Sequence, residues 1–250
     1  MGAIWGGLGQ AFAKRTRVDD ILYDDEVGTV TAKRDNALSM PAPASPKIYH
    51  IVHVDKLASI ATDGYLWSDA ELDSKAVLGT VIGMTHIKEA RKIRQLPSFP
   101  GLRVGECVPF YFGPRSVMLF MMHAKNAELS YKGGQYPIVH LVVDLRAAVD
   151  WANAHDQKWA FTLSNAASKY FEDRTDLAQI DDVNWEAVDA KYWSSCREAK
   201  QAEFLIERQF PWHLIEEIAV LNKLTGDLAV NAIAGHVHRP GVQIRPAWYY

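Results

Sequence analysis

The sequence predicts an α+β fold, in which short strands and short helices alternate without the regular spacing of a parallel strand and helix repeat. Two observations support this class. Aromatic and β-branched runs that favour strands recur along the chain, and most of them are followed by residues that cap or continue a helix. The 250 residues are 48% hydrophobic and 23% charged, which is the composition of a globular protein and excludes disorder over most of the chain.

Residues 1–46 differ in composition from the rest and predict an N-terminal extension followed by a linker. A glycine-rich start leads into an acidic stretch over 19–26, where apolar spacing allows a short helix. Three prolines within 41–46 then favour an extended backbone. The predicted domain therefore covers residues 47–250.

Strands are predicted from aromatic and β-branched runs that polar residues, Gly or Pro interrupt. Prolines within 108–115 limit the second of these runs to a short strand that passes into a turn. The run 138–143 is apolar throughout, which indicates a buried strand. The expected strands lie in 47–54, 108–115, 138–143, 159–163, 202–206, 218–221 and 242–245.

Helices are predicted from their caps and from apolar spacing. Asp55 and Asp144 are placed to cap helices, and Gly64 is placed to end the first of these. In a long acidic helix expected over 168–190, Trp185 and Val188 are the inward residues. The expected helices cover 57–61, 85–94, 116–124, 145–154, 168–190, the start of a helix at 211–215, and 228–234.

Several classes of protein are excluded or disfavoured by simple features of the sequence. The longest strongly apolar run, 116–122, is far shorter than the roughly 20 residues of a membrane span. The N-terminus lacks the basic and apolar regions of a signal peptide. Cys107 and Cys196 are too few for a disulfide framework, and no metal-ligand spacing is present. We expect a cytoplasmic protein that has no metal and does not contact a membrane.

Charge is distributed unevenly along the chain, although 27 basic and 30 acidic residues leave a net charge of −3. The range 86–115 contains six basic residues and two acidic ones. The range 172–189 contains seven acidic residues and one basic residue, Arg174. The first region can attract an anionic ligand that the second repels. The alternative is two ordinary solvated surfaces of opposite sign.

Glu203 is the strongest candidate in the sequence for a functional side chain. It begins a strand in which Gln201, Glu203 and Leu205 alternate with apolar neighbours, and a carboxylate there is costly without a cationic or hydrogen-bonding partner. The alternative is a glutamate on an edge strand in solvent. An aromatic stretch around Tyr111 and a basic helix that holds Arg91 favour a ligand site instead.

Together these stretches resemble the DarT toxins, which are ADP-ribosyltransferases that use NAD to modify bases of single-stranded DNA. The resemblance spans residues 47–250 and keeps the order of its motifs, including Val-Pro-Phe-Tyr-Phe-Gly-Pro-Arg and Lys-Gln-Ala-Glu-Phe-Leu. The matching stretches are 48–51, 85–91, 108–119, 133–141, 200–205, 210–212 and 248–250.

The resemblance implies an ADP-ribosyltransferase-like fold of two packed mixed β-sheets with flanking helices. It also implies NAD as co-substrate, single-stranded DNA as acceptor and a macrodomain antitoxin of the DarG type as partner. By the same resemblance, Glu203 and Arg91 are catalytic. The residues expected to bind NAD are His50, Tyr111, Gly64 and Arg91, and those expected to bind the acceptor are Asn165, Gln201 and Arg115.

One departure from the family pattern concerns the acceptor base. Thymidine-modifying members carry a Thr-Asp-x-His element, whereas this chain reads Thr162-Leu163-Ser164-Asn165. An amide cannot shuttle a proton but can hydrogen-bond a base edge. This difference favours guanine as acceptor. Separately, we expect the DNA backbone to contact Arg103, Arg115 and the basic residues of 88–94. The alternatives are thymine, an RNA or protein acceptor, and a binding module without catalysis.

Overall fold

The computed structural model describes residues 40–75 and 79–250. Most of the predicted extension over residues 1–46, including its short helix, therefore lies outside the described residues. The end of that segment lies against the domain: the Ala42 N–H donates to Asp181 (2.8 Å), and the Pro46 carbonyl accepts from the Leu145 N–H (3.0 Å). In the part of the chain that the structure describes, no helix is long and apolar enough to cross a membrane.

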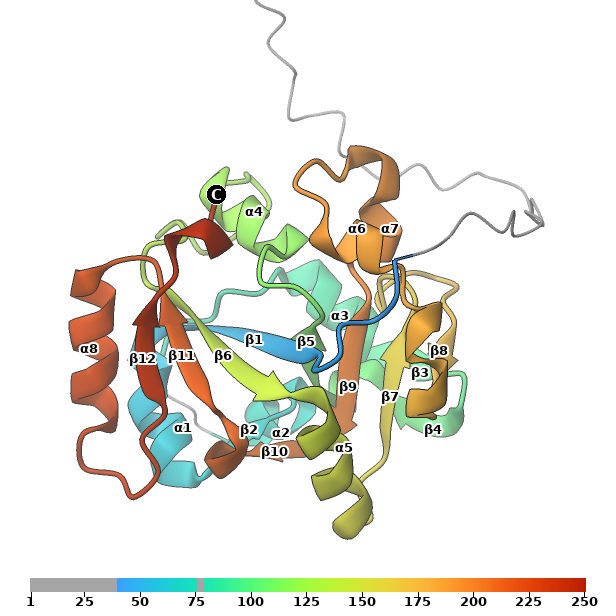
Figure 1. Ribbon diagram of the computed structural model, residues 1–250, viewed down its shortest axis with the longest axis horizontal. Helices are drawn as coiled ribbons and strands as arrows, with labels where there is room; N and C mark the ends of the chain where they lie inside the picture. Colours follow the sequence, from blue (N-terminus) through green and yellow to red (C-terminus); the bar gives the residue numbers. More distant parts are fainter. Residues whose placement is uncertain (1–39, 76–78) are drawn as a thin grey trace, which may run out of the picture. The chain divides into compact units, whose positions relative to one another are not determined.

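An eight-stranded mixed sheet organises the fold (Figure 1), in the order β12-β11-β6-β1-β5-β9-β7-β8. Its neighbours pair antiparallel, except that β11 and β12 are parallel. The strands are β1 (Lys47–His53), β5 (Cys107–Tyr111), β6 (Ile138–Asp144), β7 (Trp159–Thr162), β8 (Asp173–Arg174), β9 (Glu203–Glu207), β11 (Glu217–Val220) and β12 (Gly241–Ile244). There are also two smaller sheets of two strands. One pairs β2 (Tyr65–Trp67) with β10 (Gln209–Pro211), and the other pairs β3 (Gln95–Leu96) with β4 (Phe99–Arg103).

The α+β class is confirmed, but the strands form one large sheet instead of the two packed sheets expected. The two halves of this sheet meet between β1 and β5, which share the single register pair Tyr49 and Tyr111. By contrast, β1 pairs with β6 along its whole length. The halves therefore diverge at one seam in the middle of the sheet.

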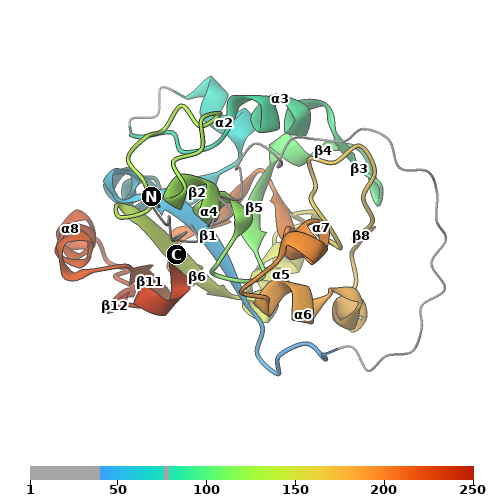
Figure 2. The ribbon, with the colours of Figure 1, turned by 90° about the horizontal axis from the view of Figure 1, so that it is seen from above.

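Helices flank the sheet on both sides, with α2 and α3 on one side and α5 and α6 on the other (Figure 2). The α-helices are α1 (Leu57–Asp63), α2 (Asp69–Ser74), α3 (Thr85–Ile93), α4 (Val117–His123), α5 (Leu145–Ala154), α6 (Trp185–Asp189), α7 (Arg197–Lys200) and α8 (Lys223–Ile233). Short 3-10 helices cover Val54–Lys56, Val104–Glu106, Leu177–Asp182, Ser194–Cys196, Trp212–Leu214 and Pro246–Trp248.

The predicted caps are confirmed in part. Asp144 caps α5 by accepting the N–H groups of Arg146 and Ala147, and Gly64 ends α1 with a φ of 74°. Asp55 does not cap α1, because it lies inside a 3-10 helix and its carboxylate accepts from Thr80 instead.

The long helix expected over 168–190 is wrong. The segment contains β8, a 3-10 helix and the short α6. Asp176 and Asn184 each accept a backbone N–H two or three residues ahead. Such local bonds begin a new short helix at each of these residues, so that one continuous helix does not form. The burial of Trp185 and Val188 is confirmed.

His140 of β6 is fully buried between the sheet and the C-terminal residues. Its Nε2 donates to the Pro114 carbonyl (2.8 Å), and its Nδ1 lies 3.2 Å from the Tyr249 hydroxyl. Burial lowers the pKa of His140 from 6.5 to about 4. The imidazole is therefore neutral in the fold at pH values where an unfolded chain is already protonated.

This difference predicts an acid-sensitive contribution to stability. Between about pH 6.5 and 4 only the unfolded state takes up the proton of His140, so the free energy of unfolding falls by about 1.4 kcal/mol per pH unit from this residue. Urea unfolding across this pH range should show a shallower decrease for His140→Gln than for wild type. The exposed His155→Gln is the control; equal pH dependence in wild type and His140→Gln contradicts the assignment.

Candidate active site

A cleft opens beside the seam between β1 and β5. Its walls come from β1, α1, β2, the start of α2, residues 80–84, α3, β5 and the first residue of β9. The space between its walls, including open solvent at the mouth, is about 1200 Å³. Of the predicted site residues, His50, Arg91, Tyr111 and Glu203 line this cleft.

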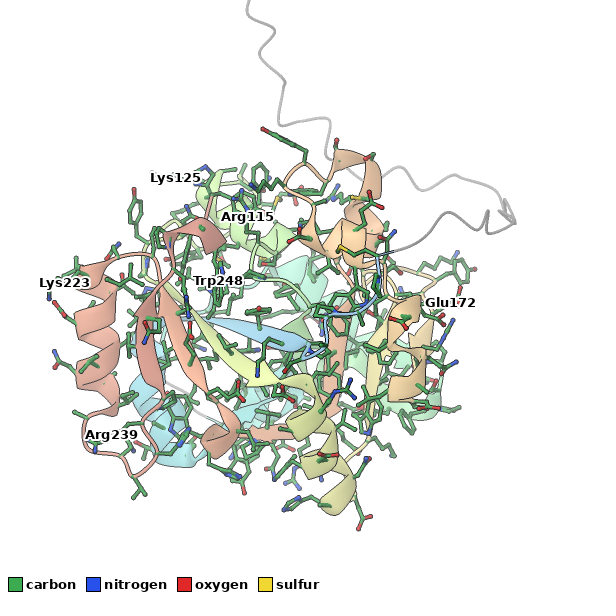
Figure 3. The ribbon with its side chains drawn as sticks, viewed as in Figure 1. Arg115, Lys125, Glu172, Lys223, Arg239 and Trp248 are labelled. Carbon is green, nitrogen blue, oxygen red and sulfur yellow. The ribbon has the colours of Figure 1, made fainter. Side chains whose placement is uncertain are left out.

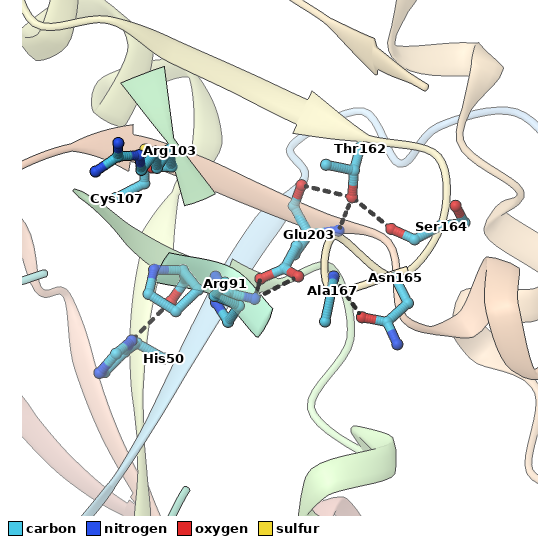
Figure 4. Close-up of polar contacts among 10 residues, drawn as sticks. His50, Arg91, Arg103, Cys107, Thr162, Ser164, Asn165, Ala167 and Glu203 are labelled. Atoms are coloured by element: carbon cyan, nitrogen blue, oxygen red, sulfur yellow. Dashed lines mark hydrogen bonds and ion pairs between the residues drawn. The ribbon is translucent and has the colours of Figure 1, made fainter. Parts of the chain in front are cut away.

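Glu203 and Arg91 form a buried ion pair in the wall of the cleft. Glu203 is 4% exposed and Arg91 is 9% exposed. The Arg91 Nη1 donates to both carboxylate oxygens, at 2.9 and 3.0 Å (Figure 4). Glu203 is therefore not the solvated edge-strand glutamate of the alternative interpretation.

The second amino group of Arg91, Nη2, is buried and has no hydrogen-bond partner. A buried donor without a partner is costly, and this one belongs to a cleft-lining residue. Burial by itself would lower the pKa of Arg91, but the Glu203 carboxylate raises it above its ordinary value. Arg91 is thus a permanent cation with one donor left for a ligand.

His50 and Tyr111 complete the polar wall around this pair. The His50 Nδ1 donates to the Pro109 carbonyl (2.7 Å), and burial lowers the pKa of His50. The neutral ring consequently keeps its Nε2 as an acceptor. Tyr111 lies opposite Glu203 in the β5–β9 register, and burial followed by the Glu203 charge raises its pKa, so the phenol keeps its proton.

Thr162, which the sequence analysis did not single out, fixes the start of β9. The backbone pairing of β7 with β9 ends with Phe161 opposite Phe204. Beyond this pair, the Thr162 side-chain hydroxyl, and not the Thr162 backbone, bonds the first residue of β9. This hydroxyl accepts from the Glu203 N–H (3.1 Å) and donates to the Ser164 carbonyl (2.6 Å), as Figure 4 shows. One side chain therefore connects Glu203 to the loop that follows β7.

The other predicted site residues are not among those that line the cleft. Gly64 is the cap of α1, and its carbonyl accepts from the Trp212 N–H (2.8 Å). Gln201 donates to the Arg197 carbonyl (3.2 Å). Arg115 lies beside the C-terminal residues (Figure 3), with its guanidinium 4.2 Å from the centre of the Tyr250 ring.

Asn165 lies in the loop after β7, on the same side as Glu203 in Figure 4. Its Oδ1 accepts from the Ala167 N–H at 2.9 Å. This contact is a local turn in which an asparagine side chain bonds the backbone two residues ahead. The amide oxygen is therefore already used by the loop itself.

The basic region that was expected to attract DNA is compensated in part. Arg91 pairs with Glu203, while Lys88 and Lys92 of α3 pair with Asp69 (2.7 Å) and Asp73 (2.9 Å). Both acids belong to α2, a helix that the sequence analysis did not predict. Arg103 remains exposed. Among the described residues, no group of three or more His, Cys, Asp or Glu is arranged to hold a metal ion.

A family model described as "ssDNA thymidine ADP-ribosyltransferase, DarT" matches residues 49–250. The chain belongs to the DarT family. A DNA ADP-ribosyl transferase of Thermus sp. (strain 2.9) is 37% identical over 218 residues, which cover 83% of this chain and 98% of the relative. The family membership makes the protein an NAD-dependent DNA ADP-ribosyltransferase.

Solved structures of a DarT are similar to this chain along the same region. Thermus sp. 2.9 DarT in complex with ADP-ribosylated ssDNA matches with a TM-score of 0.78 and 34% identity, over 85% of this chain and 100% of that one. The same Thermus protein in complex with NAD+ matches with a TM-score of 0.71 and 33% identity, over 84% and 100%. The ADP-ribosyltransferase-like fold expected from the resemblance is confirmed.

The cleft of this DarT fits a dinucleotide. The free Arg91 Nη2 supplies a donor, and the His50 Nε2 supplies an acceptor. Met84, Ile87 and Met118 add an apolar surface to the wall. Such a combination of apolar lining with a few placed polar groups is typical of cofactor sites.

The Thr162 contact can be tested by its effect on stability. Thr162→Val keeps the shape of the side chain but leaves the Glu203 N–H without an acceptor, which should lower the free energy of unfolding by about 1–3 kcal/mol. Urea denaturation measures this change. Thr162→Ser retains the hydroxyl and should stay close to wild type, and a Val variant as stable as the Ser variant would contradict the role of the hydroxyl.

Proposed function

We propose that this DarT transfers ADP-ribose from NAD to thymidine in single-stranded DNA, and that Glu203 and Arg91 carry the reaction. The observation that supports the site is the buried ion pair in the wall of the cleft. A charged pair at this depth costs desolvation free energy, and a catalytic use accounts for its presence.

In this proposal Glu203 acts on the ribose that loses nicotinamide. Breaking that bond develops positive charge on the sugar, and a carboxylate hydrogen-bonded to the 2′-hydroxyl stabilises it. Glu203 has the required rigidity, because its backbone N–H is held by Thr162 and its carboxylate by Arg91. The same carboxylate then accepts a proton from the attacking base.

Arg91, His50 and Tyr111 position the dinucleotide around Glu203. Arg91 holds the carboxylate in place through Nη1 and offers its Nη2 to an oxygen of the ligand. His50, neutral and fixed by Pro109, accepts a hydroxyl hydrogen through Nε2. The Tyr111 ring lies between β1 and β9 in the register, where it can pack against a flat nicotinamide.

The choice of thymidine replaces the guanine preference that Asn165 suggested. The oxygen of Asn165 accepts from the Ala167 N–H, so this residue has a role in shaping the loop besides any contact with a base. The description of the matching family names thymidine, and the Thermus relative crystallised with ADP-ribosylated ssDNA supports a single-stranded substrate. Recognition by a macrodomain antitoxin and a cytoplasmic location stay predictions from the resemblance and the sequence.

Removing the charge of Glu203 should remove transfer. In Glu203→Gln the amide retains the shape of the side chain but cannot stabilise the developing charge, so nicotinamide release in the presence of DNA should fall by about 10²-fold to 10³-fold or more. The readouts are nicotinamide release and the mass of an incubated oligonucleotide.

Glu207→Gln is the matched control, because Glu207 ends the same strand and pairs with Lys158 outside the cleft. Circular dichroism establishes that both variants fold. Unchanged transfer by a folded Glu203→Gln protein would contradict the mechanism, whereas NAD binding without any transfer by the wild type would identify a binding module.

The acceptor base is tested with oligonucleotides in which thymine or guanine is the one base added to a background of adenine and cytosine. We expect ADP-ribose on the thymine oligonucleotide, and we expect Asn165→Ala to leave this choice of base unchanged. Matched RNA and protein acceptors should remain unmodified. Labelling of guanine in preference to thymine would restore the base choice first inferred from Asn165.

A further inference from the structure

Lys56 is a cation of the cleft that has no acid partner. It lines the cleft from the 3-10 helix between β1 and α1 and is half-buried. The described residues provide no hydrogen bond or ion pair for its ammonium group. The other cations of the wall are paired, Lys88 with Asp69 and Arg91 with Glu203.

Among the described residues, the charges that act on Lys56 are those of Lys88, Asp55 and Asp69, but neither aspartate forms an ion pair with it. Asp55, its neighbour in sequence, is bound to Thr80 and His53. Asp63 lies at the far end of α1, about 10 Å along the helix axis. Burial, followed by the charge of Lys88, lowers the pKa of Lys56. An anionic group of a ligand would supply the ion pair that Lys56 lacks.

The side chain of Lys56 is held beneath a neighbouring loop. Gly79 has a φ of 116°, and a Cβ added there would lie 2.7 Å from the Lys56 Cγ. The Thr80 hydroxyl and N–H both bond the Asp55 carboxylate, at 2.7 and 3.2 Å. These contacts confine the aliphatic part of Lys56 and restrict where its ammonium group can go.

The position of Lys56 relates it to a particular part of a dinucleotide. The strand β1 rises by about 3.3 Å per residue, so His53 lies about 10 Å from His50, and Lys56 follows one 3-10 turn later. The backbone of Lys56 is thus displaced from that of His50 along the direction of β1. In NAD, the group that follows the nicotinamide ribose is the doubly charged pyrophosphate, which lysine binds as a point charge.

We propose that Lys56 binds the pyrophosphate of NAD, an inference that rests on the proposed use of this cleft for NAD. Lys56 is then a cofactor-binding residue that contributes affinity at a distance from the bond that breaks. Such an interaction is equally strong in the ground state and the transition state, so its loss raises KM with little effect on kcat.

The test is the affinity of wild type, Lys56→Met, Lys56→Arg and Lys223→Met for ADP-ribose and for adenosine, measured by calorimetry. Lys56→Met keeps the aliphatic stem and should weaken ADP-ribose binding by about 10-fold to 100-fold while adenosine binding stays unchanged. Lys56→Arg retains the charge and should stay near wild type. Lys223 is an exposed lysine of α8 outside the cleft, and its variant is the control.

The outcomes separate this inference from the proposed function. If wild type binds ADP-ribose and Lys56→Met binds it equally well, the role of Lys56 is overturned while the use of NAD stands. If Lys56→Met weakens both ligands to the same extent, the lost contact is not with the pyrophosphate. If wild type binds neither NAD nor ADP-ribose, the proposed function itself fails.

Discussion

The structure of the site depends on two opposite charges held together away from water. A carboxylate as buried as Glu203 needs a cationic partner, and Arg91 reaches it only because α3 packs closely on the 3-10 helix Val104–Glu106. A Cβ at Gly105 would lie 3.2 Å from the Arg91 carbonyl, so glycine permits this approach. The seam between β1 and β5 then leaves space in front of the pair for a ligand.

Rigidity around Glu203 comes from hydrogen bonds that leave a few groups unused. Thr162 holds the backbone of Glu203, and Pro109 holds the ring of His50. What remains is one buried donor on Arg91 and one lysine without an ion pair, Lys56. Groups of this kind destabilise an empty protein slightly and are satisfied when a ligand binds, which is why they indicate where a dinucleotide would lie.

Much of the fold was predictable because its strands are apolar runs with clear ends. The structure also brings together in one cleft four residues that were predicted to share a site, namely Glu203, Arg91, His50 and Tyr111. The contacts that depend on packing were not predictable. The acidic helix α2 carries no apolar run, and its pairing with α3 compensates two of the lysines in the basic region that the sequence suggested. Gly64 and Asn165 were expected at the site from the family resemblance, and the structure shows a local turn role for each. Gly64 ends α1, as its place in the sequence predicted, and Asn165 accepts from the Ala167 N–H, which the sequence did not reveal.

The role of the Glu203 and Arg91 pair in binding NAD is tested most simply by a crystal structure of the protein with a non-hydrolysable NAD analogue. We expect a Glu203 oxygen within about 2.6–3.2 Å of the 2′-hydroxyl of the nicotinamide ribose, the range of a hydrogen bond, with the Arg91 Nη2 bonded to the ligand. A dinucleotide bound outside this cleft, or a Glu203 carboxylate turned away from that ribose, would contradict this role.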